Sequence, residues 1–579
     1  MGISSSSPWL KYYCENTPHH LEYPKKTIYQ MVREAADRFP KNAAYEFMDK
    51  KTSYADFMKK IDEVAKAYLA LGIERGDRVT ICMPNCPQAL CSFYALNRIG
   101  AVSNMIHPLS AAGEIKFYLN FSKSKAILTL DQFYSKIAPI MAELENPTTL
   151  ILAKIADELM PHLAVGYTLT AGRKYPKPDR NGSYLWWKEF MRMGQKQNPA
   201  LPPITGKAEE GASILYSGGT TGTTKGILLS NMNFNALGLQ TMAASGFAPI
   251  DGMKMLSVMP IFHGFGLGIG IHTALIGGAT CILVPQFSVK TYAELLIKKK
   301  PNIIPGVPTL FEALLRAEKL ENADLSCLKG VFCGGDSLSI ELKKKVDEFL
   351  KAHGAQVQIR QGYGLTECVT ASCLTPKDYN RVGSIGVPFP DTYYKIVKPG
   401  TTDELDANLE GEICVSGPSV MLEYVDNPEE TANTLRRHSD GRIWMHSGDL
   451  GKMDEDGFVY FSQRMKRMII TSGYNVYPGQ LENIIDGHEK VLLSCVIGVK
   501  DPYKMQKVKA FVVLKPGIEP SDEVKKEILD YCKGHIAKYA MPYDIEFRPE
   551  LPKTLVGKVA YRVLEEEEAE RQAAADKKA

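Results

Sequence analysis

Residues 214–228 read ILYSGGTTGTTKGIL, a segment of glycines and hydroxyl residues that lies between two apolar runs and contains one lysine. Glycines allow a tight turn whose backbone N–H groups point at an anion, while hydroxyls and an ammonium add further donors. The pattern predicts a polyphosphate-binding loop. It is not a Walker loop, because no Gly-Lys-Ser/Thr occurs at the required spacing. The alternative, a flexible linker, rarely lies between two apolar strands. The residues predicted to contact phosphate are Ser217, Gly218, Gly219, Thr220, Thr221, Gly222, Thr223 and Lys225.

Apolar runs alternate with helical patterns on both sides of this loop. Residues 78–83 (RVTICM) and 126–130 indicate buried strands, and residues 54–71 and 340–353 indicate amphipathic helices. Strands that alternate with helices predict parallel sheets covered on both faces. After about Tyr379 the pattern changes to short strands and turns, which predicts an antiparallel sheet.

A second, smaller unit with strand and helix patterns follows Arg464. The predicted fold class is α/β, with a large N-terminal domain at residues 1–463 and a small, mobile α+β domain at residues 464–579. The large domain would combine parallel α/β subdomains with an antiparallel β subdomain. The charged tail from about residue 564 (LEEEEAERQAAADKKA) predicts a solvated or fraying helix.

Composition excludes several classes of function. The chain has 69 Lys+Arg against 66 Asp+Glu, and this balance argues against nucleic acid or an anionic membrane as the main partner, although a local basic patch remains compatible with it. Twelve cysteines without a Cys-x-x-Cys pair, and no apolar segment behind Met1, favour a cytoplasmic protein with reduced thiols. Residues 264–285 are uncharged but contain six glycines, which favours a buried helix and strand over a transmembrane segment. Peripheral membrane contact and the oligomeric state stay open.

Four further segments occur in a defined order: residues 361–367 (QGYGLTE), 444–461 with Ser447-Gly448-Asp449, 463–482 and 551–562 (LPKTLVGKVAYR). Together with the loop, they resemble the motifs of the AMP-forming acyl- and aryl-CoA synthetases, luciferases and peptide-synthetase adenylation domains. The resemblance spans nearly the whole chain. Gly218 stands where the family has a hydroxyl residue, and Thr224 where it has a proline, so one phosphate donor is lost and the loop is less constrained.

The resemblance implies ATP, Mg²⁺ and coenzyme A as ligands. By it, Tyr363 stacks on adenine, Thr366 contacts the α-phosphate, and Glu367 binds Mg²⁺. Asp449 would accept the ribose hydroxyls. The remaining nucleotide-binding residues implied are Gly334, Gly335, Gln361, Gly362 and Arg464.

The resemblance also assigns roles in the small domain. Lys466 would be the hinge between the domains, and Gly473 and Tyr474 would line the pantetheine tunnel. Lys558 would be the catalytic lysine that, with Lys225, offsets charge in the transition state. The implied reaction is attack of a carboxylate on the α-phosphorus of ATP, followed by attack of a thiol on the acyl-adenylate.

The acyl substrate is predicted from residues 260–270. His263 occupies the place where amino-acid-activating relatives carry an aspartate, so an amino acid is disfavoured. Gly264, Gly266, Gly268 and Gly270 alternate and would leave a wall without side chains for an extended chain. A medium- or long-chain fatty acid is therefore favoured. Two alternatives stay open: transfer to a carrier-protein thiol, and a degenerate AMP- or acyl-binding protein without catalysis.

Overall fold

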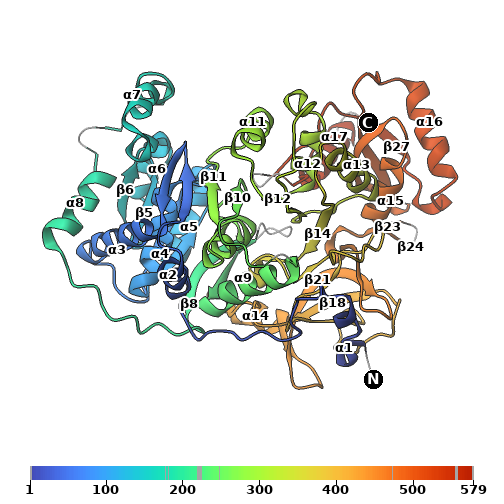
Figure 1. Ribbon diagram of the computed structural model, residues 1–579. Coiled ribbons are helices and arrows are strands. Elements are labelled where there is room, and N and C mark those ends of the chain that lie inside the picture. The colour runs from blue at the N-terminus through green and yellow to red at the C-terminus, as the bar shows by residue number, and fades with distance from the viewer. Residues whose placement is uncertain are drawn as a thin grey trace.

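The computed structural model describes residues 3–175, 178–179, 182–217, 224–246, 248–471, 474–501, 503–554 and 558–576. Two largely parallel sheets form the body of the molecule, at the left and centre of Figure 1. The first has, in spatial order, β19 (Glu423–Tyr424), β9 (Lys225–Ser230), β8 (Gly211–Ser217), β4 (Val102–Met105), β3 (Arg78–Cys82), β5 (Ala126–Leu130), β6 (Thr149–Ala153) and β7 (Leu185–Trp186).

The second sheet contains the strands whose ends carry the nucleotide motifs. Its spatial order is β16 (Val387–Pro388), β15 (Cys373–Leu374), β14 (Ile359–Tyr363), β13 (Gly330–Cys333), β12 (Ile303–Gly306), β10 (Lys254–Ser257), β11 (Thr280–Leu283), β1 (Ala43–Phe47) and β2 (Lys50–Ser53). The predicted parallel α/β architecture is confirmed, since β10 to β14 and β1 pair in parallel.

Helices cover these sheets and begin where the sequence supplies caps. Ser53 and Ser230 each accept a backbone N–H at the start of a helix, as serine does at N-caps. The helices of the large domain with eight or more residues are α2 (Ile28–Arg38), α3 (Tyr54–Ala70), α4 (Pro87–Ile99), α5 (Ala112–Ser122), α6 (Tyr134–Met141), α7 (Pro161–Leu169), α8 (Trp187–Gln197), α9 (Asn231–Ser245), α11 (Val289–Lys299), α12 (Pro308–Leu315) and α13 (Ile340–Ala352).

The predicted antiparallel sheet is also present, at the lower right of Figure 1. It consists of β17 (Tyr393–Val397), β18 (Gly411–Ser416), β21 (Ile443–Met453), β20 (Leu435–Arg437) and β22 (Val459–Arg464). Strand pairing changes after Arg464, because β23 (Ile469–Thr471) belongs to a different sheet. That sheet adds β24 (Tyr474–Val476), β26 (Met505–Leu514), β25 (Val491–Asp501) and β27 (Asp544–Phe547), with helices α15 (Pro478–Asp486), α16 (Asp522–Lys533) and α17 (Tyr561–Asp576).

The C-terminal helix α17 differs from the solvated helix predicted from its charge. Leu564 is fully buried, and the Lys509 ammonium of β26 donates to Glu568 Oε2 at 2.6 Å. Arg571 donates to Glu546 Oε2 of β27, also at 2.6 Å. The helix forms as predicted, but its charges pair with the sheet and dock it there. A run of glutamates predicts a solvated helix, because the sequence alone does not show which basic residues pair with them.

The glycine-rich segment forms a buried helix and strand, as predicted, but its glycines do a different job. Residues Phe265–Thr273 form a π-helical segment that is buried throughout. A Cβ on Gly264 would lie 1.7 Å from the Val369 carbonyl oxygen, and one on Gly266 would lie 2.1 Å from that of Pro260. The prediction of a bare wall for an acyl chain is therefore wrong at Gly264 and Gly266, which let backbone pack on backbone. Among the residues that the structure describes, no helix is long and apolar enough to span a bilayer.

Candidate active site

The carboxyl ends of β13 and β14 bring two of the predicted motifs together. The strands pair in parallel, with Cys333 opposite Gln361, so residues 334–336 lie beside the end of β14, and residues 364–367 leave the sheet at the same edge. Ligands bind at such edges in parallel α/β sheets. Gly335 has φ +83°, a conformation that favours glycine. Gly334, Gly335 and Gly362 line one cavity, so the structure groups these three predicted nucleotide-binding residues.

Asp449 lies on β21 directly opposite Arg464 of β22. The Tyr363 hydroxyl donates to Asp449 Oδ2 at 2.7 Å, and Arg464 Nε is 3.7 Å from Oδ1. Burial raises the pKa of Asp449 to about 6, although Arg464 and Tyr363 both lower it. The two partners hold a buried carboxylate in one orientation, as a bidentate acceptor of ribose hydroxyls requires. Tyr363 therefore has a second function besides the predicted stacking on adenine.

Glu367 is held by a residue that the motifs did not point to. The Tyr424 hydroxyl donates to Glu367 Oε1 at 2.8 Å. The Lys225 ammonium lies 4.7 Å from the centre of the Tyr424 ring and pairs with Glu430. Lys225 thus reaches the Glu367 side of the site, where Glu430 neutralises its charge. Tyr424 and Glu430 are far from the phosphate loop in the sequence and belong to none of the recognised motifs, so the sequence alone does not single them out.

Most of the phosphate loop falls outside the described residues. β8 ends at Ser217 and β9 begins at Lys225, and the two residues are paired across the antiparallel strands. The predicted position between two strands is therefore confirmed. Gly218, Gly219, Thr220, Thr221, Gly222 and Thr223 lie outside the described residues, so their phosphate contacts stay predictions.

Lys558 lies among the residues of the large domain. Burial lowers the pKa of Lys558, and so does the nearby Arg464 guanidinium. The carboxylates of Asp336, Asp449 and Glu367 oppose that shift, so all three act on the same ammonium group. A residue near the C-terminus thus lies in one site with Glu367, which follows β14, and with Asp449 of β21. This convergence is what the motifs predicted.

A contact between the two domains holds the Lys558 segment in place. The Val559 N–H donates to Asp336 Oδ2 at 3.3 Å, and Lys558 Cε lies 3.5 Å from where a Cβ on Gly335 would be. Within the segment, Thr554 N–H donates to the Lys558 carbonyl at 2.7 Å. Asp336, whose role was not evident from the sequence, therefore binds the catalytic segment directly.

We expect Asp336→Ala to lower the rate of acyl-adenylate formation about 5-fold and to leave thioester formation from acyl-adenylate within about 2-fold. The variant loses a hydrogen bond, worth about 1 kcal/mol, that exists only while Lys558 is in the site. The measurement is ATP–pyrophosphate exchange beside single-turnover thioester formation, with Ser337→Ala as the neighbouring control. Equal losses in both half-reactions would contradict this assignment.

His263 is a neutral imidazole beside the lysine. Burial, reinforced by the Lys558 charge, lowers the pKa of His263 to about 3. The Phe265 N–H donates to His263 Nδ1 at 3.2 Å, so Nδ1 carries a lone pair and Nε2 carries the proton. His263 is thus a hydrogen-bond donor at neutral pH. Its neighbour Gly264 packs against the Val369 backbone, and the predicted acyl contact of Gly264 is not supported.

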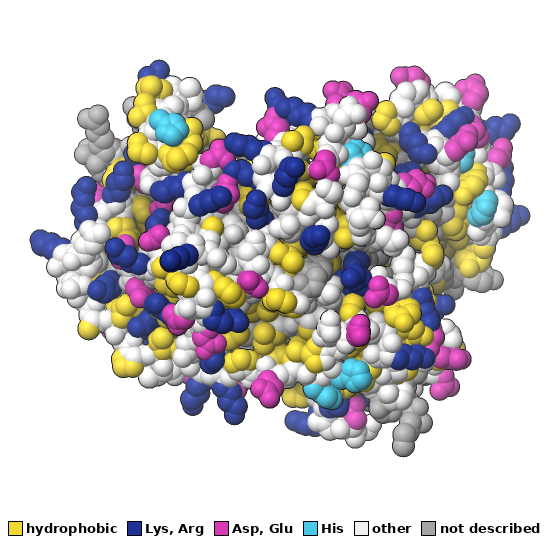
Figure 2. Space-filling model, viewed as in Figure 1, with side chains coloured by type: hydrophobic (Ala, Val, Ile, Leu, Met, Phe, Trp, Pro, Cys, Tyr) yellow, Lys and Arg dark blue, Asp and Glu magenta, His cyan; other side chains and the backbone are white. Residues whose placement is uncertain are grey.

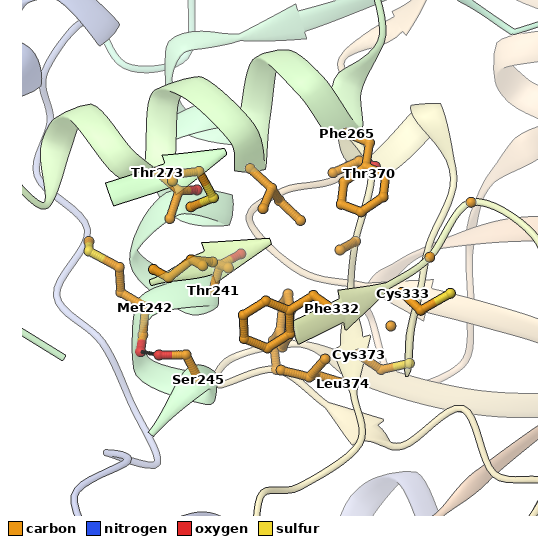
Figure 3. Close-up of a pocket in the computed structure, with 18 of the residues that line it drawn as sticks. Thr241, Met242, Ser245, Phe265, Thr273, Phe332, Cys333, Thr370, Cys373 and Leu374 are labelled. Atoms are coloured by element: carbon orange, nitrogen blue, oxygen red, sulfur yellow. Dashed lines mark hydrogen bonds between the residues drawn. The ribbon is translucent and has the colours of Figure 1, made fainter. Parts of the chain in front are cut away.

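An apolar cavity leads away from Gly334 and Gly335. Figure 3 shows Phe265, Thr370 and Cys333 at one end and Thr241, Met242 and Ser245 at the other. Phe332 and Leu374 lie between. The lining side chains come from α9, the π-helical segment and the ends of β13 to β15. The cavity is therefore present, but large apolar side chains rather than the alternating glycines form its walls.

The remaining predicted residues stay untested. Thr366 begins a short 3₁₀ turn, Thr366–Cys368, and is half-buried. Lys466 lies in the 3₁₀ turn Met465–Arg467, between β22 and β23, where the sheets change. Tyr474 begins β24, and Gly473 lies outside the described residues. Their roles in phosphate binding, hinge motion and pantetheine binding remain predictions.

No sequence motif indicates the buried hydrogen-bond chain that lies behind Asp449. Glu412 Oε1 accepts the Gly448 N–H at 3.0 Å, and Glu412 Oε2 is 2.9 Å from His446 Nδ1. His446 Nε2 is in turn 3.0 Å from His438 Nε2. These bonds fix the backbone just before Asp449. Cys414, His438 and His446 are a buried group of residue types that can bind a metal. The nitrogen atoms between the two histidines, and His446 Nδ1 beside Glu412, are already within hydrogen-bond distance of each other, so we assign no metal to this group.

Comparison with known proteins agrees with this geometry. The AMP-binding enzyme family matches residues 32–425, and the AMP-binding enzyme C-terminal domain matches residues 480–558. A long-chain-fatty-acid–CoA ligase of Bacillus subtilis (strain 168) is 35% identical over 575 residues, covering 98% of this chain and 99% of that protein. A protein of the same name from Yersinia pestis is 30% identical, covering 97% and 98%.

Solved structures share the fold over nearly the whole chain. ATP-bound MatB from Rhodopseudomonas palustris superposes with a TM-score of 0.78 at 26% identity, covering 94% of this chain and 99% of that one. The anthranilate CoA ligase AuaEII in complex with anthranoyl-AMP gives 0.82 at 23% identity, covering 96% and 99%, which bears on the fold alone. The chain therefore belongs to the AMP-binding enzyme family, which confirms the resemblance to the AMP-forming acyl-CoA synthetases that its motifs indicated.

Proposed function

We propose that the protein activates a long-chain fatty acid with ATP and transfers the acyl group to coenzyme A, releasing pyrophosphate and AMP. The observation that carries the proposal is the position of Lys558, which shares one site with Asp449 and Glu367 at the mouth of an apolar cavity. The names of the relatives from Bacillus subtilis and Yersinia pestis support a long-chain acid as substrate and coenzyme A as acceptor.

The first step joins the two substrates at phosphorus. A carboxylate oxygen of the fatty acid attacks the α-phosphorus, and the bond to pyrophosphate breaks. Asp449 would hold the ribose, so that the α-phosphate lies toward Lys558. The Lys558 ammonium then offsets negative charge that both reactants bring to the reacting centre, which is the main way phosphoryl-transfer enzymes lower the barrier.

Glu367 is the residue that fits a magnesium ion. Tyr424 occupies only Oε1, and among the described residues no donor binds Oε2, which leaves an acceptor for a hydrated cation. Mg²⁺ favours such sites, with one or two carboxylates, phosphate oxygens and retained waters. When bound, it would neutralise polyphosphate charge. Tyr424 would orient the carboxylate toward that ion.

His263 would orient the carboxyl group of the acid. Its protonated Nε2 is a donor, and its low pKa keeps the ring neutral beside Lys558 at pH 7. A neutral donor binds a carboxylate and later the adenylate carbonyl without adding charge that competes with Lys558. The cavity behind would take the alkyl chain.

The second step requires a thiol to reach the same carbonyl. Adenylation turns the carboxylate oxygen into part of AMP, a good leaving group, and attack by the coenzyme A sulfur releases it. Removal of the Lys558 segment would open the approach, and it breaks the contact between Val559 and Asp336. Lys466, at the change of sheet, is the proposed hinge, and Gly473 and Tyr474 are the proposed pantetheine contacts.

A panel of carboxylic acids with ATP and coenzyme A, read by mass spectrometry, tests the function. We expect long-chain acyl-CoA and AMP in equal amounts. We also propose that the protein acts in the cytoplasm. Acyl-adenylate that accumulates in the presence of coenzyme A would favour transfer to a carrier-protein thiol. Nucleotide binding without pyrophosphate release from any acid would favour the binding-protein alternative.

The cavity makes a prediction about chain length. We expect Thr241→Trp to lower turnover of hexadecanoate at least about 10-fold and to leave octanoate within about 2-fold, because an indole at the end remote from Gly334 takes the space of the outer chain. The measurement is kcat/KM for both acids. Thr402→Trp, on an exposed turn, is the control. Equal losses for both acids would show that the chain does not occupy this cavity.

A further inference from the structure

Helix α7 is an apolar helix that the protein itself does not cover. Its residues Pro161–Leu169 read PHLAVGYTL, and none of them is buried. Val165 is 60% exposed, Leu169 53% and Leu163 37%. Figure 1 shows the helix projecting from the upper left of the large domain, away from both parallel sheets. Tyr167 packs on the hydrophobic core, but the helix still presents an apolar face of three large aliphatic side chains to a partner.

The segment of α7 and the turn after it is basic. The acids just before it, Asp157 and Glu158, pair with lysines. Residues 159–178 contain three lysines or arginines and no aspartate or glutamate. Arg173 and Lys174, in the short turn after the helix, are exposed. In Figure 2, yellow hydrophobic side chains cover the projection at the upper left, with dark blue basic side chains at its edge. The near-neutral total charge of the chain does not indicate this local basic patch.

Ion pairs join the turn just before α7 to a wider face of the large domain. Lys50 and Lys60 both lie within 4.0 Å of Glu158, which is two residues before Met160 and the start of α7. The turn between β1 and β2 continues this face, because Asp49 pairs with Lys298 of α11 at 2.8 Å. Lys298 is itself 64% exposed. Figure 1 shows α7 and α11 along the same upper edge of the domain.

We propose that α7 docks the protein on the surface of an anionic lipid bilayer. Val165, Leu169 and Leu163 enter the boundary between head groups and acyl chains, while Arg173 and Lys174 contact acidic head groups. A convex apolar tip with a basic border matches a bilayer surface better than a protein groove. This proposal does not depend on the proposed enzymatic function. A long-chain fatty acid would, however, be most concentrated in the same lipid bilayer.

Flotation with lipid vesicles tests the proposal. The full-length protein is mixed with vesicles of phosphatidylcholine, with and without phosphatidylglycerol, and the bound fraction is measured. We expect binding to the anionic vesicles, a drop of at least about 10-fold in the partition coefficient for the double variant V165E/L169E, and a smaller drop for R173Q/K174Q that disappears at high salt. Since both apolar side chains are already exposed, the first variant should keep the thermal unfolding midpoint of the wild type.

The matched control is V382E/L409E, which changes two side chains of similar exposure, 70% and 51%, elsewhere on the surface. It should bind like the wild type. Wild-type protein that fails to bind anionic vesicles, or equal losses for both double variants, would overturn the proposal. So would a wild-type dimer in sedimentation velocity that V165E/L169E dissociates, if vesicle binding is unchanged, because a second copy would then cover α7. None of these outcomes bears on acyl-CoA formation, which is assayed separately with detergent-solubilised acid.

Discussion

Replacing Lys558 with alanine is expected to slow acyl-adenylate formation about 10²- to 10³-fold, the usual effect of removing one donor aimed at transition-state charge. The ammonium shares its site with three carboxylates, and its partial burial weakens the solvent screening between these charges. Thioester formation from preformed acyl-adenylate should stay within about 3-fold, because the ammonium serves the first step alone.

The two half-reactions are measured separately, by fatty-acid-dependent ATP–pyrophosphate exchange and by single-turnover thioester formation. Lys553→Ala is the control, since this exposed lysine lies in the same segment. An unchanged exchange rate in Lys558→Ala would mean that another group carries the charge. Loss of both steps by the same factor would indicate that the variant disturbs the site as a whole.

Replacing Asp449 with asparagine is expected to weaken ATP binding about 30- to 100-fold and to increase the stability of the ligand-free protein. Asparagine keeps one acceptor oxygen but loses the charge, and hydrogen bonds to charged groups are worth about 1.5–3 kcal/mol. Stability should rise because the pKa of Asp449 in the folded protein, about 6, lies above its ordinary value. The ionised carboxylate therefore destabilises the fold, by an amount that grows between about pH 4 and pH 6 and is on the order of 3 kcal/mol at higher pH.

The sign of this effect gives a pH test. As pH falls from 8 through 6, Asp449 takes up a proton, so ligand-free wild type should gain stability relative to Asp449→Asn, and the difference should vanish near pH 4. Over the same range wild type should lose its advantage in ATP affinity. Calorimetry without fatty acid measures the free energy of unfolding and the ATP affinity of each protein. Because ATP titrates equally in both experiments, the ratio of the two affinities is independent of the protonation of ATP. A variant that is less stable at pH 8 would contradict the account of a destabilising buried charge.

The motifs could predict the site because its chemistry is local in sequence. Parallel strands place their carboxyl ends at one edge, so residues after β13 and β14 had to meet once both were recognised as neighbouring strands. Asp449 and Arg464 follow from one hairpin, whose register sets them opposite each other. Lys558 is different: no local pattern brings it there, and only the family resemblance predicted its position.

The sequence could not predict what depends on partners far along the chain. Asp336 looked like an exception to its motif, yet it contacts Val559 across the two domains. Tyr424 and Glu430 hold Glu367 and Lys225 without any spacing that marks them.

The glycine row shows the limit of reasoning from side-chain size alone. A missing side chain can leave space for a ligand or for neighbouring backbone, and only the packing against Val369 and Pro260 distinguishes the two. Phe265 and Ile269, which line the cavity from the same segment, were apolar positions without special spacing. Helix α7 is the reverse case, because its apolar sequence predicts burial and its exposure is visible only in the fold.

Oxygen transfer from the acid to AMP tests the central chemistry most directly. The protein is supplied with hexadecanoate labelled with ¹⁸O in both carboxylate oxygens, with ATP and coenzyme A, and the products are weighed by mass spectrometry. If the carboxylate attacks the α-phosphorus in the site around Lys558, each AMP carries one ¹⁸O, pyrophosphate carries none, and the thioester keeps the other. Label in pyrophosphate, or AMP without label alongside labelled thioester, would contradict an acyl-adenylate formed at this site.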